Sequence, residues 1–361
     1  MANKHASLDV LFTDIADAIR EKTGDIGTIP AVEFPKTILE LSPPSPPAPP
    51  PPLPYLTFSS PEKFTLKVND GTKHWDGTLK YSTDASNWYI WNGSATLSSA
   101  SDGNRNVLYL RGTVNKKITG HSYNYRWVLT GSNIACTGNI ENLLDYTTVK
   151  SGGHPPMADY CYYYMFYNCT SLTQAPALSA TTLTSNCYYA MFFKCTGLTQ
   201  APELPATTLA EGCYMYMFYG CTSLAQAPAL PATTLAKDCY WSIFNRCTGL
   251  TQAPSILPAT TLAEGCYKFM FEFTAITFIP RIMATTYATD SCKGMFDDIK
   301  TLNIYSSSRP GYTYGWTAPA STYCSIMFGS DDGESEWAQL DGSNFPNSGT
   351  PTEGKMYYFY G

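Results

Sequence analysis

Three consecutive units of 26 residues read CYYYMFYNCTSLTQAPALSATTLTSN from Cys161, CYYAMFFKCTGLTQAPELPATTLAEG from Cys187 and CYMYMFYGCTSLAQAPALPATTLAKD from Cys213. Further copies begin at Cys239, at Cys266 and, in decayed form, at Cys292. A fixed period of this length is typical of stacked supersecondary units that bury a core only between neighbours. The sequence therefore predicts a mainly β solenoid.

Positions that stay apolar in every unit identify the expected core. Three such columns are Met165, Met191, Met217, Ile243 and Met270; Phe166, Phe192, Phe218, Phe244 and Phe271; and Leu172, Leu198, Leu224, Leu250 and Ile276. Full burial of one such side chain contributes roughly 1.5–3 kcal/mol. We expect each column to form a buried ladder. The lead cysteines are expected to be buried, reduced and stacked, because buried free cysteines act as small apolar residues.

Other positions vary from unit to unit and are expected on the outside. The second residue after each lead cysteine is Tyr163, Tyr189, Met215 and Trp241 in the first four units. A stripe of exposed aromatic residues is typical of an interaction surface, so these residues are predicted to bind a partner. The alternative is that the tyrosines pack against the adjacent unit with their hydroxyls in water. Glutamines of the QAP segment and the paired threonines are expected to form hydrogen-bonded ladders between units.

The repeated pattern C-x3-MF-x2-C-T-[SG]-L-T-Q-A-P-x-L-P-A-T-T-L resembles the BspA-type leucine-rich repeats found in bacterial and phage surface proteins. The resemblance covers residues from about 136 to 299. It implies a leucine-rich-repeat solenoid that serves adhesion, and that repeat family is used with many different ligands.

The N-terminal residues 1–42 are predicted to form a helical attachment module. Apolar residues recur at helical spacing within residues 5–23, and they are Leu8, Leu11, Phe12, Ile15 and Ile19. The stretch LFTDIADAIREKTG followed by GTIPAVEFPKTILEL is similar to the short N-terminal module of tail-associated and baseplate-associated proteins of gut phages. A generic helical hairpin or oligomerisation handle is the alternative. Residues 43–54 are rich in proline and are expected to form an extended linker.

Residues 55–135 are predicted to form an antiparallel β-sandwich. Runs such as KFTLKV and VLYLRGTV are rich in β-branched and aromatic residues, and Asn-Gly and Asp-Gly turn signals separate them. The tryptophans of this region are expected in the core, or in part on a sugar-stacking platform, and they are Trp75, Trp88, Trp91 and Trp127. Residues 136–299 are assigned to the solenoid, of which 136–157 are expected to form a polar-edged cap.

Residues 300–361 are predicted to be either a closing cap or a distal binding tip. Aromatic residues crowd into this Gly- and Ser-rich stretch, as in a paratope, and Trp316 and Trp337 are assigned to the binding surface. The acidic residues Asp331, Asp332 and Glu334 lack the alternating spacing of an EF-hand loop. A solvated turn is therefore the preferred interpretation.

Composition argues against several functional classes. The formal net charge is −6 and no basic run occurs, which argues against nucleic acid as a partner. No stretch approaches the roughly 18–20 apolar residues that cross a bilayer. Four histidines are scattered along the chain without two-ligand spacing, so we expect no metal, cofactor or catalytic triad. A polysaccharide-degrading enzyme is only the third alternative.

These observations predict a structural virion protein of a phage tail: a tail fibre, tail tip or receptor-binding subunit that presents the solenoid for host-surface adhesion. Its expected partners are other virion tail or baseplate proteins and a host surface glycan or protein. We expect a homo-oligomer, with a trimer first among the possible states, which is assembled in the host cytoplasm and located in the virion tail. The second alternative is a bacterial cell-surface adhesin or secreted binding module.

Overall fold

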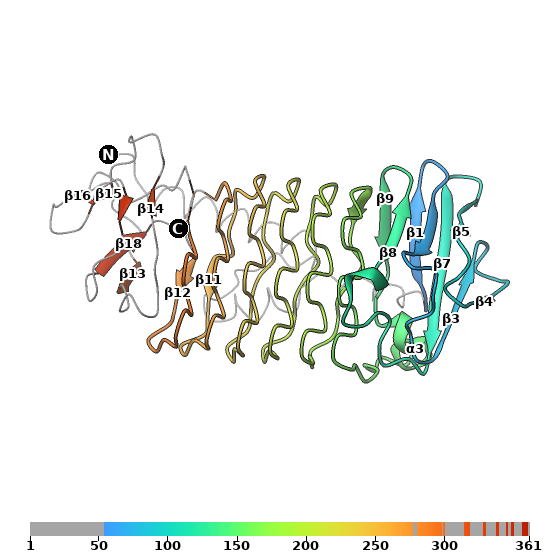
Figure 1. The fold of residues 1–361 in the computed structure, drawn as a ribbon, viewed down its shortest axis with the longest axis horizontal. Coiled ribbons are helices and arrows are strands. Elements are labelled where there is room, and N and C mark those ends of the chain that lie inside the picture. Colours follow the sequence, from blue (N-terminus) through green and yellow to red (C-terminus); the bar gives the residue numbers. More distant parts are fainter. Residues whose placement is uncertain are drawn as a thin grey trace, which may run out of the picture. The chain divides into compact units, whose positions relative to one another are not determined.

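The computed structural model describes residues 54–276, 280–297 and 299, together with the backbone of six short strands in the C-terminal segment. Contacts divide the chain into two parts, Met1–Pro52 and Leu53–Gly361, and every described residue belongs to the second. The protein is mainly β, with mixed sheets and few helices (Figure 1). Within these described residues no helix is long and apolar enough to cross a membrane. The predicted N-terminal helix and most of the proline-rich linker lie outside the described residues.

Two sheets form the first described region. The seven-stranded sheet has the order β10-β9-β1-β7-β3-β4, with β6 beside β7, and the smaller sheet has the order β5-β2-β8. The strands of the larger sheet are β1 (Leu56–Ser60), β3 (Thr78–Ser82), β4 (Tyr89–Trp91), β6 (Ala100–Ser101), β7 (Asn106–Thr113), β9 (Ile134–Thr137) and β10 (Leu172–Gln174). Those of the smaller sheet are β5 (Leu97–Ser98), β2 (Thr65–Val68) and β8 (Trp127–Thr130). All these pairs are antiparallel except β9 with β10, which is parallel.

Tryptophans join the two sheets. Trp91 on β4 contacts Trp127 on β8 with ring centroids 5.4 Å apart, and Trp75 lies 5.1 Å from Trp91. All three are buried, so they form the predicted core and offer no free ring face to a sugar. Trp88 is only half-buried, and the guanidinium of Arg111 covers its ring at 3.9 Å.

The repeat units lie side by side and are joined by a regular set of backbone hydrogen bonds (Figure 1). The amide of Tyr162 donates to the carbonyl of Cys187 at 2.8 Å, and the amide of Tyr164 donates to that of Tyr189 at 2.9 Å. The intervening amides donate three residues back within their own unit, as Met165 does to Tyr162 at 3.1 Å. This alternation recurs in each following unit, from the residue before the lead cysteine to the seventh residue after it. In this segment every second amide links one unit to the next.

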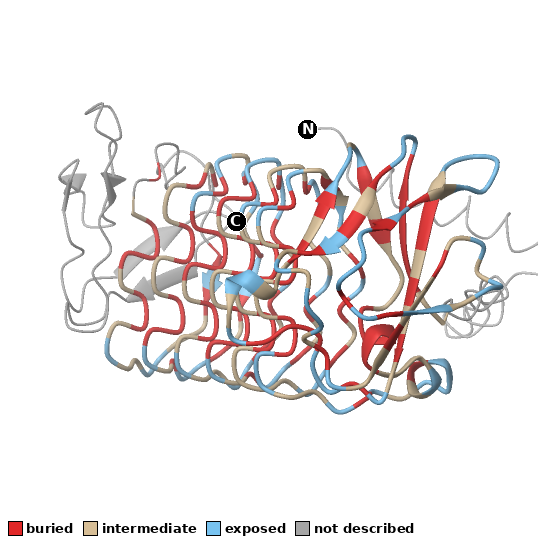
Figure 2. Ribbon diagram, turned by 45° about the vertical axis from the view of Figure 1, so that its right-hand side comes forward, coloured by how far each residue is buried: buried red, intermediate tan, exposed pale blue. Residues whose placement is uncertain are grey.

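The predicted core ladders are confirmed. All members of the Met, Phe and Leu columns are buried, and buried residues recur at corresponding points of successive units (Figure 2). The Phe rings stack in parallel with centroids 5.6 to 5.8 Å apart from Phe166 to Phe271. A further stacked and buried ladder was not predicted, and it consists of Tyr162, Tyr188, Tyr214, Tyr240 and Tyr267.

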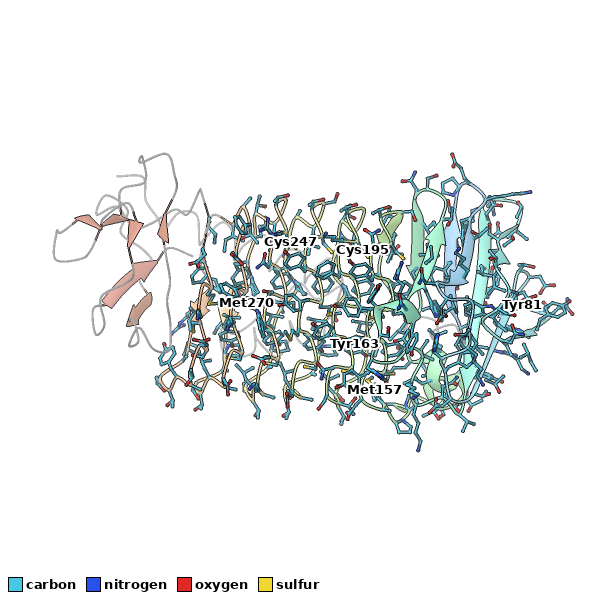
Figure 3. All side chains as sticks on the ribbon, in the orientation of Figure 1. Tyr81, Met157, Tyr163, Cys195, Cys247 and Met270 are labelled. Atoms are coloured by element: carbon cyan, nitrogen blue, oxygen red, sulfur yellow. The ribbon has the colours of Figure 1, made fainter. Side chains whose placement is uncertain are left out.

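The cysteines lie among these ladders. Every described cysteine is buried, as predicted, and none forms a disulfide with another described cysteine. Four units have a second cysteine eight residues after the first. In this column the thiol of Cys195 donates to the carbonyl of Phe166 at 3.0 Å, and the thiol of Cys247 donates to the carbonyl of Phe218 at 2.9 Å (Figure 3). Burial raises the pKa of Cys187 to about 12, so the neutral thiol is the stable form inside the protein.

Each unit turns at residues with left-handed backbone. They occupy the position just before the lead cysteine and the third and seventh positions after it, as in Asn186 (φ 55°), Ala190 (φ 50°) and Lys194 (φ 56°). Glycine serves at some equivalent positions, such as Gly212 (φ 57°) and Gly220 (φ 69°). The left-handed conformation costs a residue with a Cβ roughly 1–2 kcal/mol. The turn geometry therefore stores strain wherever another residue replaces glycine.

Replacing Lys194 tests this strain, because its side chain is exposed. We expect Lys194→Gly to be more stable than Lys194→Ala by about 1 kcal/mol, since only the alanine retains the left-handed penalty. In an ordinary helix or strand the order is reversed, with glycine less stable by roughly 0.5–1 kcal/mol. Urea unfolding of the two variants measures the difference. A more stable alanine variant would contradict the assigned backbone.

The sixth copy begins one residue earlier than predicted. The amide of Tyr267 donates to the carbonyl of Ser291 at 2.8 Å, and Phe296 stacks on Phe271 at 5.8 Å. Ser291 therefore occupies the lead position, and Cys292 occupies the position of the buried tyrosines. The prediction of a lead residue at Cys292 is wrong because the fifth unit is one residue shorter than the others.

The segment before the first unit also differs from the prediction of a polar-edged cap. Strand β9 crosses the predicted boundary between residues 135 and 136 and pairs with β10 of the first unit. The following α3 (Asn142–Lys150) buries Leu143 and Leu144. The amide of Trp127 donates to the carbonyl of Met165 at 2.7 Å. The sheets themselves thus cover the first unit, and residues 136–157 lie partly in the core.

The Gln and Thr positions are joined through the backbone. Isolated parallel bridges pair Gln226 with Gln252 and Thr208 with Thr234, while these side chains are exposed. The expected ladders therefore exist in the main chain. Short parallel strands β11 (Ile256–Leu257) and β12 (Arg281–Ile282) continue the same side of the stack.

The remaining described elements are short. A 3-10 helix, η1, covers Tyr123–Tyr125 before β8. The C-terminal strands form three antiparallel pairs, β13 with β18, β14 with β17 and β15 with β16. Their bounds are β13 (Tyr314–Thr317), β14 (Phe328–Gly329), β15 (Trp337–Ala338), β16 (Asn344–Phe345), β17 (Ser348–Gly349) and β18 (Met356–Phe359).

Candidate interaction surface

Eight aromatic side chains of the first four units and Tyr160, which directly precedes the first unit, form one contiguous patch, which we call the aromatic face. Every member is within a ring contact of another member, with centroids 4.5 to 6.4 Å apart. All are half-buried except Tyr160, which is 37% exposed. The members are Tyr160, Tyr163, Tyr164, Tyr167, Tyr189, Phe193, Tyr216, Tyr219 and Trp241.

The rings of the aromatic face stack along the direction of the repeat. Tyr163 lies on Tyr189 at 4.6 Å with an angle of 20°, and Phe193 lies on Tyr219 at 4.5 Å with an angle of 6°. Tyr167 stacks on Phe193 in the same way, and the other contacts of the aromatic face are edge-to-face or tilted. The rings therefore contact one another through many of their faces. A sugar-stacking platform needs a free ring face, so this geometry favours edge contacts with a protein surface.

Backbone strain lies beneath the aromatic face. Tyr160 (φ 58°), Tyr164 (φ 55°) and Tyr216 (φ 57°) all have left-handed backbone, whereas Gly294 (φ 60°) serves at the position equivalent to Tyr164 in the sixth unit. A glycine would avoid the penalty at each of these positions. Ala190 (φ 50°), Ser242 (φ 52°) and Phe269 (φ 51°) have left-handed backbone at the position equivalent to Tyr164 in other units. This strain is therefore a property of the repeat and is not confined to the tyrosines.

The hydroxyls of Tyr163, Tyr189 and Tyr216 remain neutral at physiological pH. Burial, with smaller contributions from Tyr164 and Tyr160, raises the pKa of Tyr163 to about 12. Burial likewise raises the pKa of Tyr189 and of Tyr216. Each hydroxyl can thus donate and accept a hydrogen bond, as is common at tyrosine-rich binding surfaces.

Cations border the aromatic face. The guanidinium of Arg126 lies 5.7 Å from the ring centre of Tyr167, and the ammonium of Lys268 lies 4.8 Å from that of Trp241. Lys268 also pairs with Asp290 at 3.0 Å. In the fifth unit Lys268 and Glu272 occupy the second and sixth positions, and Phe269 occupies the third.

The residues predicted from sequence fall partly on this surface. Tyr163, Tyr189 and Trp241 belong to it, and Met215 occupies the equivalent position in the third unit. All four are half-buried. Tyr163 (Figure 3), Tyr189 and Trp241 each contact a ring of an adjacent unit and keep part of their surface in solvent, so both alternatives hold in part.

Tyr164 and Tyr216, at the third position after the lead cysteine, were not predicted to belong to the surface. Tyr167, Phe193 and Tyr219 occupy the sixth position, and its variation among units predicts that it lies on the outside, although these three residues were not assigned to the binding surface. The left-handed backbone of Tyr164 and Tyr216 gives no signal in the sequence.

The other predicted site residues are not placed. The backbone of Trp316 lies in β13 and that of Trp337 in β15, while both side chains lie outside the described residues. The attachment residues also lie outside them, and they are Leu8, Leu11, Phe12, Ile15 and Ile19. Among the described residues no group of three or more His, Cys, Asp and Glu side chains is placed to hold a metal ion.

Comparison with family models, with curated proteins and with solved structures finds no match to this chain.

Proposed function

We propose that this protein is a structural virion protein of a phage tail, namely a tail fibre, tail tip or receptor-binding subunit. In this proposal the repeat units form a BspA-like leucine-rich-repeat solenoid, the preceding sheets form a β-sandwich that covers its first unit, and residues 1–42 attach it to other tail or baseplate proteins. The aromatic face then contacts the host surface.

One observation carries the binding role. The rings of the aromatic face are contiguous across four units, and each keeps part of its surface exposed. Exposed aromatic edges give contact area at a low cost in side-chain entropy. The stacking of their faces favours a protein over a glycan as the partner of this surface.

Adhesion can be measured with fluorescently labelled full-length protein on host cells. We expect Tyr189→Ala with Tyr216→Ala to weaken binding at least about 30-fold, because aromatic hot spots contribute 2 kcal/mol or more. The matched control is Thr208→Ala with Thr234→Ala, which replaces exposed side chains of the same two units. It should bind like the wild type.

Two results would contradict the assignment of this face. Either the Tyr189→Ala and Tyr216→Ala variant adsorbs at full strength, or the threonine control loses binding to the same extent. Circular dichroism and the unfolding midpoint of each variant establish that it is folded before its binding is interpreted.

A further inference from the structure

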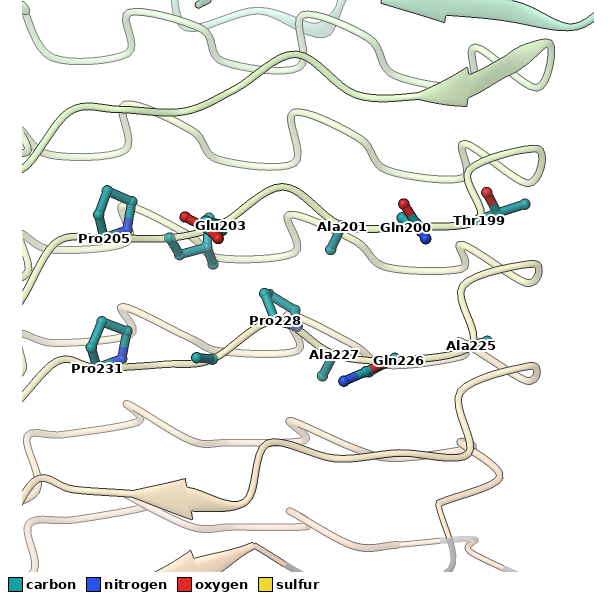
Figure 4. Close-up of a pocket in the computed structure, with 12 residues that line it drawn as sticks. Thr199, Gln200, Ala201, Glu203, Pro205, Ala225, Gln226, Ala227, Pro228 and Pro231 are labelled. Atoms are coloured by element: carbon teal, nitrogen blue, oxygen red, sulfur yellow. The ribbon is translucent and has the colours of Figure 1, made fainter. Parts of the chain in front are cut away.

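A shallow groove lies between the second and third units, apart from the aromatic face (Figure 4). Its volume is about 520 Å³, and it is bounded by the segments TQAPELP of the second unit and AQAPALP of the third. A similar groove of about 530 Å³ lies between the first and second units. The two share a wall that contains Gln200, Glu203 and Pro205. They therefore form one surface across three units.

The groove offers identical polar groups at a constant interval. Gln174, Gln200 and Gln226 line it from successive units, and all three side chains are exposed. Gln200 lies above Gln226 in Figure 4. Each amide presents two donors and one acceptor. Equivalent Phe rings of neighbouring units are 5.6 to 5.8 Å apart, and this interval sets the spacing of the amides along the stack.

The chemistry of the walls restricts the ligand. Glu203 is the single charged residue among those that line the two grooves, so no cation is present there to bind an anionic polymer. Prolines such as Pro205 and Pro231 lack an N–H, which prevents a regular ladder with an extended peptide. The same prolines fix the backbone and offer apolar C–H surface. These walls suit a neutral chain rich in hydroxyls.

We propose that the groove binds an extended neutral polysaccharide, whose successive sugar residues meet the glutamine amides of successive units. The site ends at the fourth unit, where the additional residue Ile256 is 39% exposed and forms β11. This site goes beyond the adhesion role of the aromatic face. Its test uses soluble oligosaccharides and the full-length protein, so either proposal can fail while the other stands.

The experiment is calorimetric titration with neutral oligomers of glucose, mannose, galactose, rhamnose and N-acetylglucosamine, and with oligogalacturonate as the anionic comparison. At least one neutral oligomer should bind, and oligogalacturonate should not. Gln200→Ala with Gln226→Ala should weaken that binding about ten-fold or more, because two amide hydrogen bonds are lost. Gln252→Ala is the matched control, since Gln252 is exposed at the same position of the fourth unit but does not line the groove.

The control variant should keep the wild-type affinity. The proposal is overturned if no oligomer of the panel binds, if oligogalacturonate binds as well as the neutral oligomers, or if the double variant binds like the wild type. Equal weakening by Gln252→Ala would also overturn it. Because the replaced side chains are exposed, the unfolding midpoints of the variants should match the wild type, and this measurement excludes misfolding as the cause of lost binding.

Discussion

Raising the pH from 8 to 10 should lower the free energy of unfolding by at least about 5 kcal/mol. Burial raises the pKa of four thiols from 9.0 to about 12, and they are Cys169, Cys187, Cys239 and Cys247. Above pH 9 the unfolded chain loses these protons while the folded protein keeps them. Stability is therefore complete below pH 9 and falls as the pH rises, by roughly 1 kcal/mol per thiol at pH 10.

Urea unfolding at pH 8, 9 and 10 measures this loss. The Cys187→Ala and Cys239→Ala double variant removes two of the titrating groups, so its loss over the same interval should be smaller by roughly 2–3 kcal/mol. The comparison concerns the slope with pH, and any cavity in the variant changes only the starting value. An equal slope in both proteins, or constant stability between pH 8 and 10, is incompatible with buried neutral thiols.

Phe218→Ala should destabilise the protein by about 3–5 kcal/mol, as expected for truncation of a fully buried phenylalanine. The ring stacks at 5.7 Å on Phe192 and at 5.8 Å on Phe244, so its loss leaves a cavity that two neighbouring units share. Hydrogen exchange should accelerate in these units before it does in the sheets around Trp127.

The control for this variant is Ser223→Ala, which changes an exposed residue of the same unit and should alter stability by less than about 0.5 kcal/mol. A loss below about 1 kcal/mol for Phe218→Ala would mean that the ring column does not hold the units together.

Comparison of the copies with one another identified the core, because a position that is buried in one unit is buried in every unit and therefore stays apolar in all of them. Phe218 is constant in type among the units, and it is buried as predicted. Tyr214 belongs to an equally constant column, but tyrosine suits both a core and a surface, so its burial could not be read from the sequence. The register of the sixth copy could have been predicted from the sequence. The Met-Phe pair lies four and five residues after the lead residue in the other units, so Met295 and Phe296 require a lead residue at Ser291.

The aromatic face could be predicted only in part. Variation from unit to unit showed that Tyr163 and Tyr189 are not in the core, but it did not show that their rings stack on each other and are half-buried. The left-handed backbone of Tyr164 and Tyr216 left little trace in the sequence, because glycine marks only some of the equivalent positions.

The cover of the first unit was not predictable either. It depends on contacts between segments far apart in the chain, such as the ring contact of Phe58 on β1 with Phe166 of the first unit at 6.1 Å. No periodicity in the sequence connects these residues. The groove could not be predicted either. A glutamine repeated in every unit predicts hydrogen bonds between units, but it does not indicate that the glutamine side chains are exposed.

The central proposal places this protein on a phage tail, and gold-labelled antibody against the full-length chain tests it most directly. Electron microscopy of intact, purified particles should show the label on the tail, and particles with unlabelled antibody present in excess should show none. Label on the bacterial cell surface, with none on the particles, would contradict the proposal and favour a bacterial adhesin.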